Sequence, residues 1–473
     1  MNPNYGMRRN LVVDTDAYKI THWLQRPQNI TKLYSYGEPR VGGKDKEICF
    51  FGLNPIIQNH FMQKVTPEMI IEGIEESIDT FGTPDYFNKE VWQRVMNLEY
   101  LPLRIRAVPE GTVLPEGNVA FTIESTEPWF ANMVSHFEDY LMWVWYSTAV
   151  CTRAFNIKKG ILPSFLKSSD FTNEVLPVAV NDFGLRGGTF FEGSAMGGMA
   201  HLVHFVGSDN MPASRMIKDY YGMKGRAKSV WATEHSVATA YGDGVGEFDY
   251  VKAQLSQFTD RIKSIVIDSY DPDNFIQNVV GNPEIRDMII SHEGRIVFRP
   301  DSGKPLTNVC KYSDMLGAIF GFSLNSKGYK VINHNVGLIQ GDGMNEQSIP
   351  ELYTEYIKTG WAADNIITGS GGGLLEEGLT RDTQRWAVKA CYGEKDGVPF
   401  NIQKRPKSDM TKASKAGELK LHKIGSSFMT LESSKETPQQ FKAYQDSLVT
   451  VFENGKHYPI TFEEVIANAN KHL

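Results

Sequence analysis

A run of glycines in the second half of the chain has the composition of a phosphate-binding loop. The run Gly369–Leu375 (GSGGGLL), which includes Gly371 and Gly372, follows the strand-like segment Asn365–Thr368. Backbone N–H groups of such a loop can converge on a phosphate where a helix begins, although a tight turn without a ligand has the same composition. No Gly-Lys-Ser/Thr follows, so the run is not a Walker A loop. Downstream, Arg381 supplies the fixed positive charge that suits a phosphate.

Three further apolar segments end in acidic loops. These loops are Arg299-Pro-Asp301-Ser-Gly303, Gln340-Gly341-Asp342-Gly343 and Asp268-Ser-Tyr-Asp271. Arginine suits phosphate or carbonyl oxygens, and aspartate suits ribose hydroxyls or the ligand shell of Mg²⁺. Taken singly, each loop is also compatible with a surface ion pair on a turn. Together with the glycine run, they predict a site for a sugar phosphate bound with Mg²⁺.

Two other positions suit a flat ligand that carries an amide. Phe183, in the segment Asp182–Gly187 (DFGLRG), can present its ring to a heterocycle, although a core phenylalanine is the ordinary alternative. Asp209 accepts hydrogen bonds when ionised, so it favours a ligand that donates them, such as a carboxamide. His235, in ATEHS, becomes a candidate because it falls among these loops.

The elements that must position these loops are strands alternating with helices. From about residue 178, short β-branched runs end in polar or glycine-rich turns, and helical stretches lie between several of them. This order is the βα unit of a parallel sheet or barrel, in which reactive side chains lie at the carboxyl ends of the strands. Asp182, Arg186, Asp268, Arg299, Asp301 and Asp342 all occupy such ends.

The segments before and after this region have a different pattern of apolar and polar residues. Helical spacing is predicted over 65–100, 129–146 and 154–167, and alternating hairpin strands over 101–126. The chain ends in a Lys-rich loop, a short strand pair and a helix over 462–471.

We therefore expect an α/β protein with two kinds of domain. An irregular (β/α) barrel is predicted over 154–390. A mixed α+β domain is predicted from the N-terminal part, 1–153, and from a C-terminal segment, 391–473, that packs back on it.

Charge, cysteine content and apolar stretches argue against several classes of protein. The 473 residues carry a net charge of −7, which argues against nucleic acid as the main partner. The four cysteines form no CxxC pair, so no zinc or redox motif is indicated, and no metal ligands are assigned. The N-terminus lacks the apolar region of a signal peptide, and the apolar stretch 140–151 is too short for the ~20 residues that span a membrane. We expect a soluble, cytoplasmic protein.

These motifs together resemble a known family. The strings are DTDAYKITH (14–22), AVPEGTVLPEGNVAFTIE (107–124), NDFGLRG (181–187), ATEHS (232–236), FRPDSG (298–303), IQGDG (339–343) and GSGGGLLEEGLTRD (369–382). In order and spacing, they are similar to the nicotinamide phosphoribosyltransferase family, whose barrel is of the type II phosphoribosyltransferase kind. Leu185 and Ala17 depart from its animal members, which have tyrosine and serine there, and the lysines of the tail align only loosely.

The resemblance implies a reaction and an assembly. Family members transfer phosphoribosyl from 5-phosphoribosyl 1-pyrophosphate to nicotinamide, which yields nicotinamide mononucleotide and pyrophosphate for NAD salvage. They work as homodimers with active sites at the interface, and they couple ATP hydrolysis to transfer through a phosphohistidine. The nearest alternative is a nicotinate phosphoribosyltransferase, whose substrate carboxylate an acid such as Asp209 would repel. A non-catalytic binding protein on the same scaffold is a second alternative.

The resemblance also implies roles for individual residues. Phe183 stacks on nicotinamide, Tyr18 of the other subunit covers its second face, and Asp209 takes the carboxamide. Arg299 and Asp301 hold the base and ribose region. The ribose and phosphate of the nucleotide are assigned to Gly341, Asp342, Gly371, Gly372 and Arg381. Pyrophosphate and ATP are assigned to Arg40, Arg186, His235, Lys389, Lys404 and Lys412, and catalysis to His235, Asp301 and Arg299.

Overall fold

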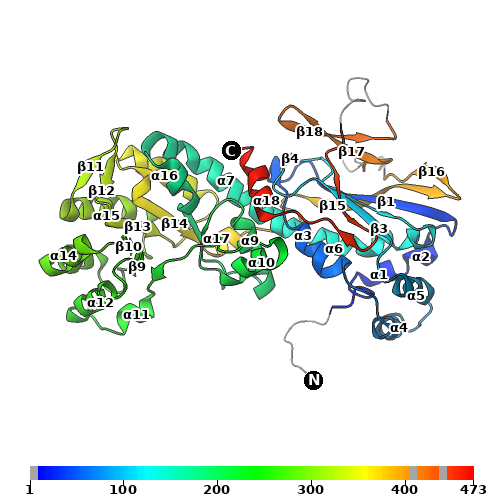
Figure 1. The fold of residues 1–473 in the computed structure, drawn as a ribbon, viewed down its shortest axis with the longest axis horizontal. Coiled ribbons are helices and arrows are strands. Elements are labelled where there is room, and N and C mark those ends of the chain that lie inside the picture. The colour runs from blue at the N-terminus through cyan, green and yellow to red at the C-terminus, as the bar shows by residue number, and fades with distance from the viewer. Residues whose placement is uncertain (1–8, 405–412, 436–444) are drawn as a thin grey trace. The chain divides into compact units, whose positions relative to one another are not determined.

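The structure is a computed structural model that describes residues 9–404, 413–435 and 445–473. Its chain divides into two compact units, both drawn in Figure 1. The first unit comprises Met1–Thr152, Tyr220–Gly222 and Leu379–His472, and the second comprises Arg153–Asp219 and Met223–Gly378 together with Leu473. The domain boundaries expected from the sequence, after residues 153 and 390, stay a prediction.

The second unit is built on a parallel sheet of seven strands in the order β7-β6-β14-β13-β10-β9-β8. All its neighbouring strands pair in parallel. The strands are β6 (Val180–Asp182), β7 (Gly207–Ser208), β8 (Trp231–Ala232), β9 (Lys263–Val266), β10 (Ile296–Arg299), β13 (Val336–Gln340) and β14 (Ile366–Ser370). β10 and β13 are buried almost throughout, which is why their sequences are continuous rather than alternating apolar runs.

This parallel sheet curls toward closure. Gly207, in the edge strand β7, forms a parallel bridge with Lys228, which shortly precedes β8 at the opposite edge. The N–H of Ser208 also donates to the carbonyl oxygen of Lys228 at 2.9 Å. A curled parallel sheet with helices between its strands confirms the prediction of an irregular α/β barrel.

Helices and one hairpin connect the strands of the second unit. The helical elements are α7 (Val144–Ser168), which spans the division of the chain at residue 152, α8 (Thr172–Val175), η3 (Leu176–Val178), α9 (Phe191–His201), α10 (Met211–Tyr221), α11 (His235–Thr239), α12 (Val245–Leu255), α13 (Pro272–Asn274), η4 (Phe275–Val280), α14 (Pro283–Ser291), α15 (Pro305–Phe320), α16 (Ser348–Lys358), η5 (Ala363–Asn365) and α17 (Gly372–Leu375). The hairpin pairs β11 (Phe322–Leu324) with β12 (Lys330–Ile332).

The first unit contains an antiparallel sheet in the order β16-β15-β1-β5-β3-β19-β20. Its strands are β1 (Ile30–Pro39), β3 (Leu103–Ala107), β5 (Phe121–Ser125), β15 (Trp386–Lys395), β16 (Val398–Asn401), β19 (Val449–Glu453) and β20 (Lys456–His457). β1 comes from the N-terminal segment and pairs with β15 from the C-terminal segment, and β3 pairs with β19 in the same way. The prediction of a mixed domain built from both ends of the chain is therefore confirmed.

Short ribbons and helices complete the first unit. The ribbons pair β2 (Glu47–Cys49) with β4 (Val113–Pro115), and β17 (Leu419–Ile424) with β18 (Ser427–Glu432). The helical elements are α1 (Ala17–Ile20), α2 (His22–Gln25), α3 (Leu53–Ile56), η1 (Ile57–Phe61), α4 (Pro67–Phe81), α5 (Lys89–Leu98), η2 (Pro128–Phe137), α6 (Glu138–Met142) and α18 (Phe462–Asn470).

The start of α4 shows how local sequence sets a helix boundary. Thr66 accepts a hydrogen bond from the N–H of Met69, and Pro67 occupies the first helical position, where its missing N–H costs nothing. Gly82 ends the helix with φ of 75°, a left-handed conformation that glycine adopts without strain.

The segment 129–146 differs from its prediction as a single helix. Residues Pro128–Phe137 form the 3-10 helix η2, and a separate helix, α7, begins at Val144. A 3-10 helix has about three residues per turn, so Phe130, Met133 and His136 share one face, and all three are buried. Ala131, Val134 and Phe137 form a second buried face, so two of the three faces of this helix are buried.

The motif at residues 14–22 is anchored by one carboxylate from α6. Asp139 accepts hydrogen bonds from the Thr15 hydroxyl and from the N–H of Asp16, both at 2.9 Å, and it forms an ion pair with the buried Lys19. Burial raises the pKa of Asp139, but its hydrogen bonds from Lys19 and Asp16 outweigh burial and lower it. The anchored segment leaves Tyr18 57% exposed.

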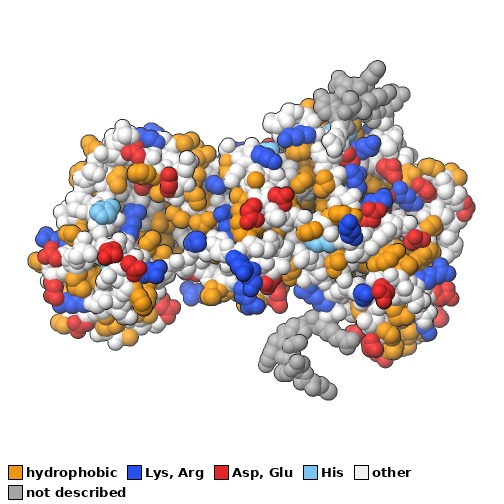
Figure 2. Space-filling model, in the orientation of Figure 1, with side chains coloured by type: hydrophobic (Ala, Val, Ile, Leu, Met, Phe, Trp, Pro, Cys, Tyr) orange, Lys and Arg blue, Asp and Glu red, His pale blue; other side chains and the backbone are white. Residues whose placement is uncertain are grey.

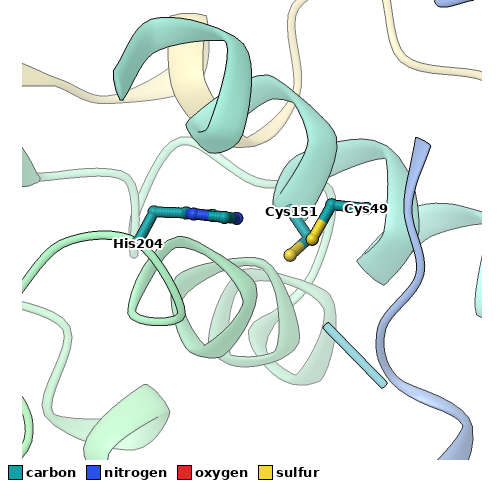
Figure 3. A group of neighbouring side chains, drawn as sticks. All are labelled: Cys49, Cys151 and His204. Carbon is teal, nitrogen blue, oxygen red and sulfur yellow. The ribbon is translucent and has the colours of Figure 1, made fainter. Parts of the chain in front are cut away.

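Two cysteine thiols meet inside the first unit. Cys49 and Cys151 are fully buried, and their sulfur atoms lie within 4.8 Å of each other (Figure 3). Burial raises the pKa of the Cys151 thiol well above its ordinary value, and Cys49 contributes to the rise. Because the reactive thiolate is disfavoured there, we assign this pair a role in packing.

The surface charge and the hydrophobicity of the helices were compared with what nucleic-acid binding and membrane crossing require. Figure 2 shows Lys and Arg side chains interspersed with Asp and Glu on the face that it draws, rather than gathered in the stripe typical of a nucleic-acid footprint. Across the described ranges, no helix combines the length and the apolar character that crossing a membrane requires.

Candidate active site

A pocket of about 1110 Å³ opens at the carboxyl ends of the parallel strands of the second unit. Its walls come from the loops that follow β6, β7, β8, β10, β13 and β14. Sites for small ligands usually enclose roughly 300–1000 Å³, so this pocket has room for a ligand of nucleotide size.

Most of the site residues predicted from the sequence line this pocket. They are Phe183, Arg186, Asp209, His235, Arg299, Asp301, Gly341, Asp342, Gly371 and Gly372. The lining also includes Asn210, Asn345 and Glu377, which the sequence analysis did not select. Nothing in the composition of their segments distinguishes these three from ordinary loop residues.

The other predicted residues belong to the first unit or lie outside the described residues. Those in the first unit are Tyr18, Arg40, Arg381, Lys389 and Lys404, whereas Lys412 falls outside the described ranges. Within its unit, Arg381 donates to the carbonyl oxygen of Trp386 at 2.9 Å and pairs with Asp382 at 2.8 Å. The roles of these residues toward the pocket stay predictions.

The Phe183 ring rests on the glycine loop. The N–H of Phe183 donates to the carbonyl oxygen of Ser370 at 2.9 Å. A Cβ added to Gly369 would lie 2.1 Å from the Phe183 ring, and one added to Gly373 would lie 2.4 Å from the carbonyl oxygen of Met344. Packing therefore demands glycine at both of these positions.

Gly371 and Gly372 are left to face the pocket. Added Cβ atoms at these two positions would meet nothing closer than 3.5 Å and 3.7 Å, so neighbouring protein atoms do not require glycine at either position. Their backbone is the part of the run that can approach a phosphate.

A buried arginine holds the backbone of this loop from behind. Arg153, whose side chain is 6% exposed, donates to the carbonyl oxygens of Gly373, Leu374 and Glu377 at 2.6–3.0 Å. Hydrogen bonds from a charged donor are stronger than neutral ones, and each contributes roughly 1.5–3 kcal/mol to stability. Sequence reasoning missed Arg153, because a single arginine in an apolar helix carries no spacing signal.

His235 lies between a hydroxyl and two carboxylates. Its Nδ1 is 3.2 Å from the Ser269 hydroxyl, and its Nε2 is 3.7 Å from Asp268 Oδ1 and 3.6 Å from Asp301 Oδ2. Glu234, the residue before His235, accepts from the Ser236 hydroxyl, so it is not placed to fix the tautomer of the imidazole. The geometry therefore favours Asp268 or Asp301 for that task.

Asp268 also supports the loop after β10. Its Oδ2 accepts from the N–H groups of Asp301 and Ser302, at 2.9 Å and 2.6 Å, and from the Ser302 hydroxyl at 2.7 Å. Its Oδ1 is buried and has no hydrogen-bond partner among the described residues, which leaves an acceptor on the side of His235. One carboxylate thus connects the candidate nucleophile with the Asp301 loop.

The pocket brings cations and acids together. Arg186 and Arg299 supply positive charge suited to phosphate oxygens, whereas Asp301 and Asp342 offer the carboxylate oxygens that Mg²⁺ takes as ligands. Such a mixture fits a polyanion that binds together with a divalent cation better than it fits either alone.

Comparisons with known proteins identify the family of this chain. The family model described as the nicotinate phosphoribosyltransferase (NAPRTase) family matches residues 178–456, and that described as the nicotinamide phosphoribosyltransferase N-terminal domain matches residues 10–105. A protein of Xanthomonas campestris pv. campestris (strain 8004), named nicotinamide phosphoribosyltransferase, is 36% identical over 98% of both chains. This chain belongs to the nicotinamide phosphoribosyltransferase family.

Other relatives of this family member are more distant. A nicotinamide phosphoribosyltransferase of Acinetobacter baylyi is 29% identical over 95% of both chains. Among solved structures, the nicotinate-nucleotide pyrophosphorylase of Pyrococcus furiosus covers 100% of this chain and 98% of its own, with a TM-score of 0.63 at 14% identity. The human nicotinic acid phosphoribosyltransferase covers 97% of this chain and 93% of its own, with a TM-score of 0.60 at 15% identity. At such identities, these structures establish the fold, and the protein is an enzyme of this family.

Replacing Arg153 tests the support of the glycine loop. We expect Arg153→Met to weaken the binding of ribose 5-phosphate, measured by titration calorimetry, by about tenfold or more, because losing even one hydrogen bond from a charged donor costs about 1.5 kcal/mol. Arg226→Met is the matched control, because Arg226 caps the carbonyl oxygens of Leu202 and Val203 at the end of α9. A folded Arg153→Met protein that binds like wild type would contradict the role.

Proposed function

We propose that this enzyme transfers the phosphoribosyl group of 5-phosphoribosyl 1-pyrophosphate to the ring nitrogen of nicotinamide, as a step of NAD salvage. The products are nicotinamide mononucleotide and pyrophosphate. One observation carries the proposal: a single pocket lined by a ring for stacking (Phe183), a carboxylate for an amide (Asp209) and an open glycine backbone for a phosphate. The Xanthomonas and Acinetobacter relatives are both named nicotinamide phosphoribosyltransferase, which supports the same base.

The reaction suits a site that positions the two substrates and neutralises the charge of the leaving pyrophosphate. The pyridine nitrogen attacks C1 of the ribose while the bond from C1 to pyrophosphate breaks, and positive charge develops on the sugar. The nitrogen carries no proton to remove, so no general base is needed at that atom. Arg186 stabilises the departing pyrophosphate, and Arg299 holds the base and ribose region. Asp301 and Asp342 would hold Mg²⁺, which would supply further charge neutralisation.

The direct test compares bases under identical conditions. Purified protein is incubated with 5-phosphoribosyl 1-pyrophosphate, Mg²⁺ and either nicotinamide or nicotinate, and the mononucleotides are separated by chromatography. We expect nicotinamide mononucleotide as the main product. A preference for nicotinate would favour the alternative assignment, and no product with either base would leave only a binding role.

Asp209 should set the choice between the two bases. Its Oδ1 accepts from the Ser229 hydroxyl, and its N–H donates to the carbonyl oxygen of Asp182 at 3.0 Å, so this lining carboxylate is held in place. We expect Asp209→Asn to raise kcat/KM for nicotinate relative to nicotinamide by about fivefold or more, since repulsion of a second carboxylate at ~4 Å is worth about 1–4 kcal/mol.

A matched control separates selectivity from general damage. Asp342→Asn removes another carboxylate of the pocket, and it should slow the reaction with both bases by the same factor. An unchanged ratio in Asp209→Asn would mean that Asp209 does not face the exocyclic group of the base.

We further propose that ATP stimulates the reaction through His235. A ring nitrogen of His235 attacks the γ-phosphorus of ATP, an N–P bond forms, and ADP leaves as the P–O bond breaks. An unprotonated imidazole nitrogen carries the lone pair with which a histidine attacks phosphorus. The support is the placement of the imidazole, within 3.7 Å of the acids Asp268 and Asp301 and at the wall of the pocket.

The His235 proposal predicts separable losses. His235→Ala should abolish ATP hydrolysis and ATP stimulation while slow ATP-independent transfer survives, because the remaining loops still bind both substrates. Ser236→Ala should keep the stimulation, and it removes the neighbouring hydroxyl as a competing phosphate acceptor. The measurement is transfer with and without ATP for the three proteins, and full stimulation of His235→Ala would exclude this histidine as the phosphorylated residue.

We propose a homodimer in which each subunit completes the other's site. Large apolar side chains flank the lining segments of the pocket and are well exposed in the single chain: Phe190 by 60%, Phe191 by 58% and Met211 by 76%. A second copy would cover them and bring its exposed Tyr18 to the open face of the base. Apolar surface of this kind is typical of an interface.

Mixing two inactive variants tests the shared site. Tyr18→Ala and Asp209→Ala should each be weak, and subunit exchange between them should restore activity at one site of each mixed dimer. The measurement is transfer activity after exchange has been verified by mass spectrometry of differently tagged subunits. Activity that stays at the average of the two variants would contradict the shared site.

A further inference from the structure

A fully buried carboxylate lies behind the base-binding part of the pocket. Asp182 ends β6 and is 0% exposed, and it is not itself among the residues that line the pocket. Its Oδ1 accepts from the N–H of Gly184 at 2.7 Å. Its Oδ2 accepts from Asn210 Nδ2 at 3.1 Å and from the Ser208 hydroxyl at 3.4 Å. The carboxylate therefore meets three donors.

These contacts connect the two loops that carry the predicted base contacts. Strands β6 and β7 are short and pair only through Asn181 with Gly207 and Asp182 with Ser208. Beyond that pairing, the Asp182 side chain ties the turn after Phe183 to the segment on either side of Asp209. Hydrogen bonds to this one side chain therefore act together with the backbone bond from the Asp209 N–H to the Asp182 carbonyl oxygen in setting the relative placement of the ring and the acid.

A third element is tied into the same cluster. Asn210 also donates from Nδ2 to the carbonyl oxygen of Ser194 in α9 at 2.9 Å. A Cβ on Gly198 of α9 would lie 2.4 Å from Asn210 Nδ2 and 2.6 Å from Asp182 Oδ2, so this helix approaches the pair as closely as glycine allows. Such close packing gives the carboxylate–amide pair little freedom to adopt another geometry.

We propose that Asp182 is a positioning residue for recognition of the base, because its ionised carboxylate holds Phe183 and Asp209 in the relative placement that grips a flat amide. This inference rests on the proposed function and extends it. Asp182 does not touch the substrate, so its removal acts on the affinity for the base more than on the chemical step.

The charge of Asp182 falls in an accessible pH range. Burial raises the pKa of Asp182 to about 6, and like-charge repulsion from Asp209 adds to the rise, whereas the hydrogen bonds from Gly184, Asn210 and Ser208 lower it. Among the described residues packed around it, Asp209 from the β7 loop is the charged neighbour. α9 presents Gly198 and the Ser194 carbonyl, and β14 presents its backbone at Ser370.

The direction of the pH effect follows from the donors. Above pH 6 the carboxylate is ionised and accepts from all three. Below pH 6 the added proton takes one acceptor position and faces donors, so the cluster loosens. The KM for nicotinamide should therefore rise as the pH falls through 6.

The test measures KM for nicotinamide and kcat at saturating 5-phosphoribosyl 1-pyrophosphate between pH 5.5 and 8. In wild type, KM should rise below pH 6. Asp182→Asn should raise KM at pH 7.5 by about tenfold, the effect of one lost hydrogen bond to a charged group, with kcat changed less. Its KM should no longer depend on pH in this range. The titration of substrate phosphates is common to all variants, so differences between them report on the protein.

Three further variants make the outcome decisive. Asp209→Asn should keep the transition but move it to a lower pH, because it removes the like charge that helps raise the pKa of Asp182. The double substitution Asp182→Asn with Asn210→Asp exchanges donor and acceptor, and it should recover part of the affinity. Asp364→Asn replaces another carboxyl whose pKa is raised by burial, in η5 just before the amino end of β14 rather than at the carboxyl ends of the strands, and it should leave KM unchanged.

The outcomes separate this inference from the proposed function. If wild type makes no nicotinamide mononucleotide, the proposed function falls, and this inference falls with it. If wild type is active but its KM is flat across pH 6, or Asp182→Asn binds nicotinamide like wild type, only the role of Asp182 is overturned. Failure of the Asp182→Asn protein to fold leaves the wild-type and Asp209→Asn pH profiles to decide.

Discussion

The pocket depends on the common direction of the seven strands in the second unit. Hydrogen bonding between parallel neighbours places every carboxyl end at one edge of the sheet, so loops far apart in sequence must meet there. The curl of the sheet, seen in the bridge between Gly207 and Lys228, turns this edge into a concave rim. Six loops with a ring, two arginines and several acids then face one space of about 1110 Å³.

Three buried or nearly buried charges hold the loops of this rim. Asp182 fixes the ends of β6 and β7, Asp268 fixes the Asp301 loop, and Arg153 fixes the glycine loop. Arg153 donates to three backbone carbonyl groups and Asp268 accepts from two backbone N–H groups, whereas Asp182 accepts from one backbone N–H and two side-chain donors. A buried charge is costly unless it is fully hydrogen-bonded, so each of these groups also makes its loop difficult to rearrange. Pre-organisation of this kind suits a reaction that depends on positioning.

Much of this architecture follows from the sequence, and the reasons are local. Short β-branched runs that end in glycine or acid predict strands of a parallel sheet. Three of these runs are the strands β10, β13 and β14. Because the loop residues directly follow these strands in the sequence, the strand prediction also places Arg299, Asp301 and Asp342 at the carboxyl ends of the sheet. All three line the pocket. In contrast, Arg153 and the packing roles of Gly369 and Gly373 depend on contacts between distant segments. The 3-10 geometry of η2, with two buried faces, was likewise not revealed by the aromatic content of the segment.

The most direct test of the account is a crystal structure of the enzyme with nicotinamide mononucleotide bound. The account predicts that the pyridine ring stacks on Phe183, that the carboxamide donates to Asp209, and that the phosphate accepts from the N–H groups of Gly371 and Gly372. A nucleotide whose ring lies away from Phe183, or whose phosphate lies outside the glycine loop, would contradict it.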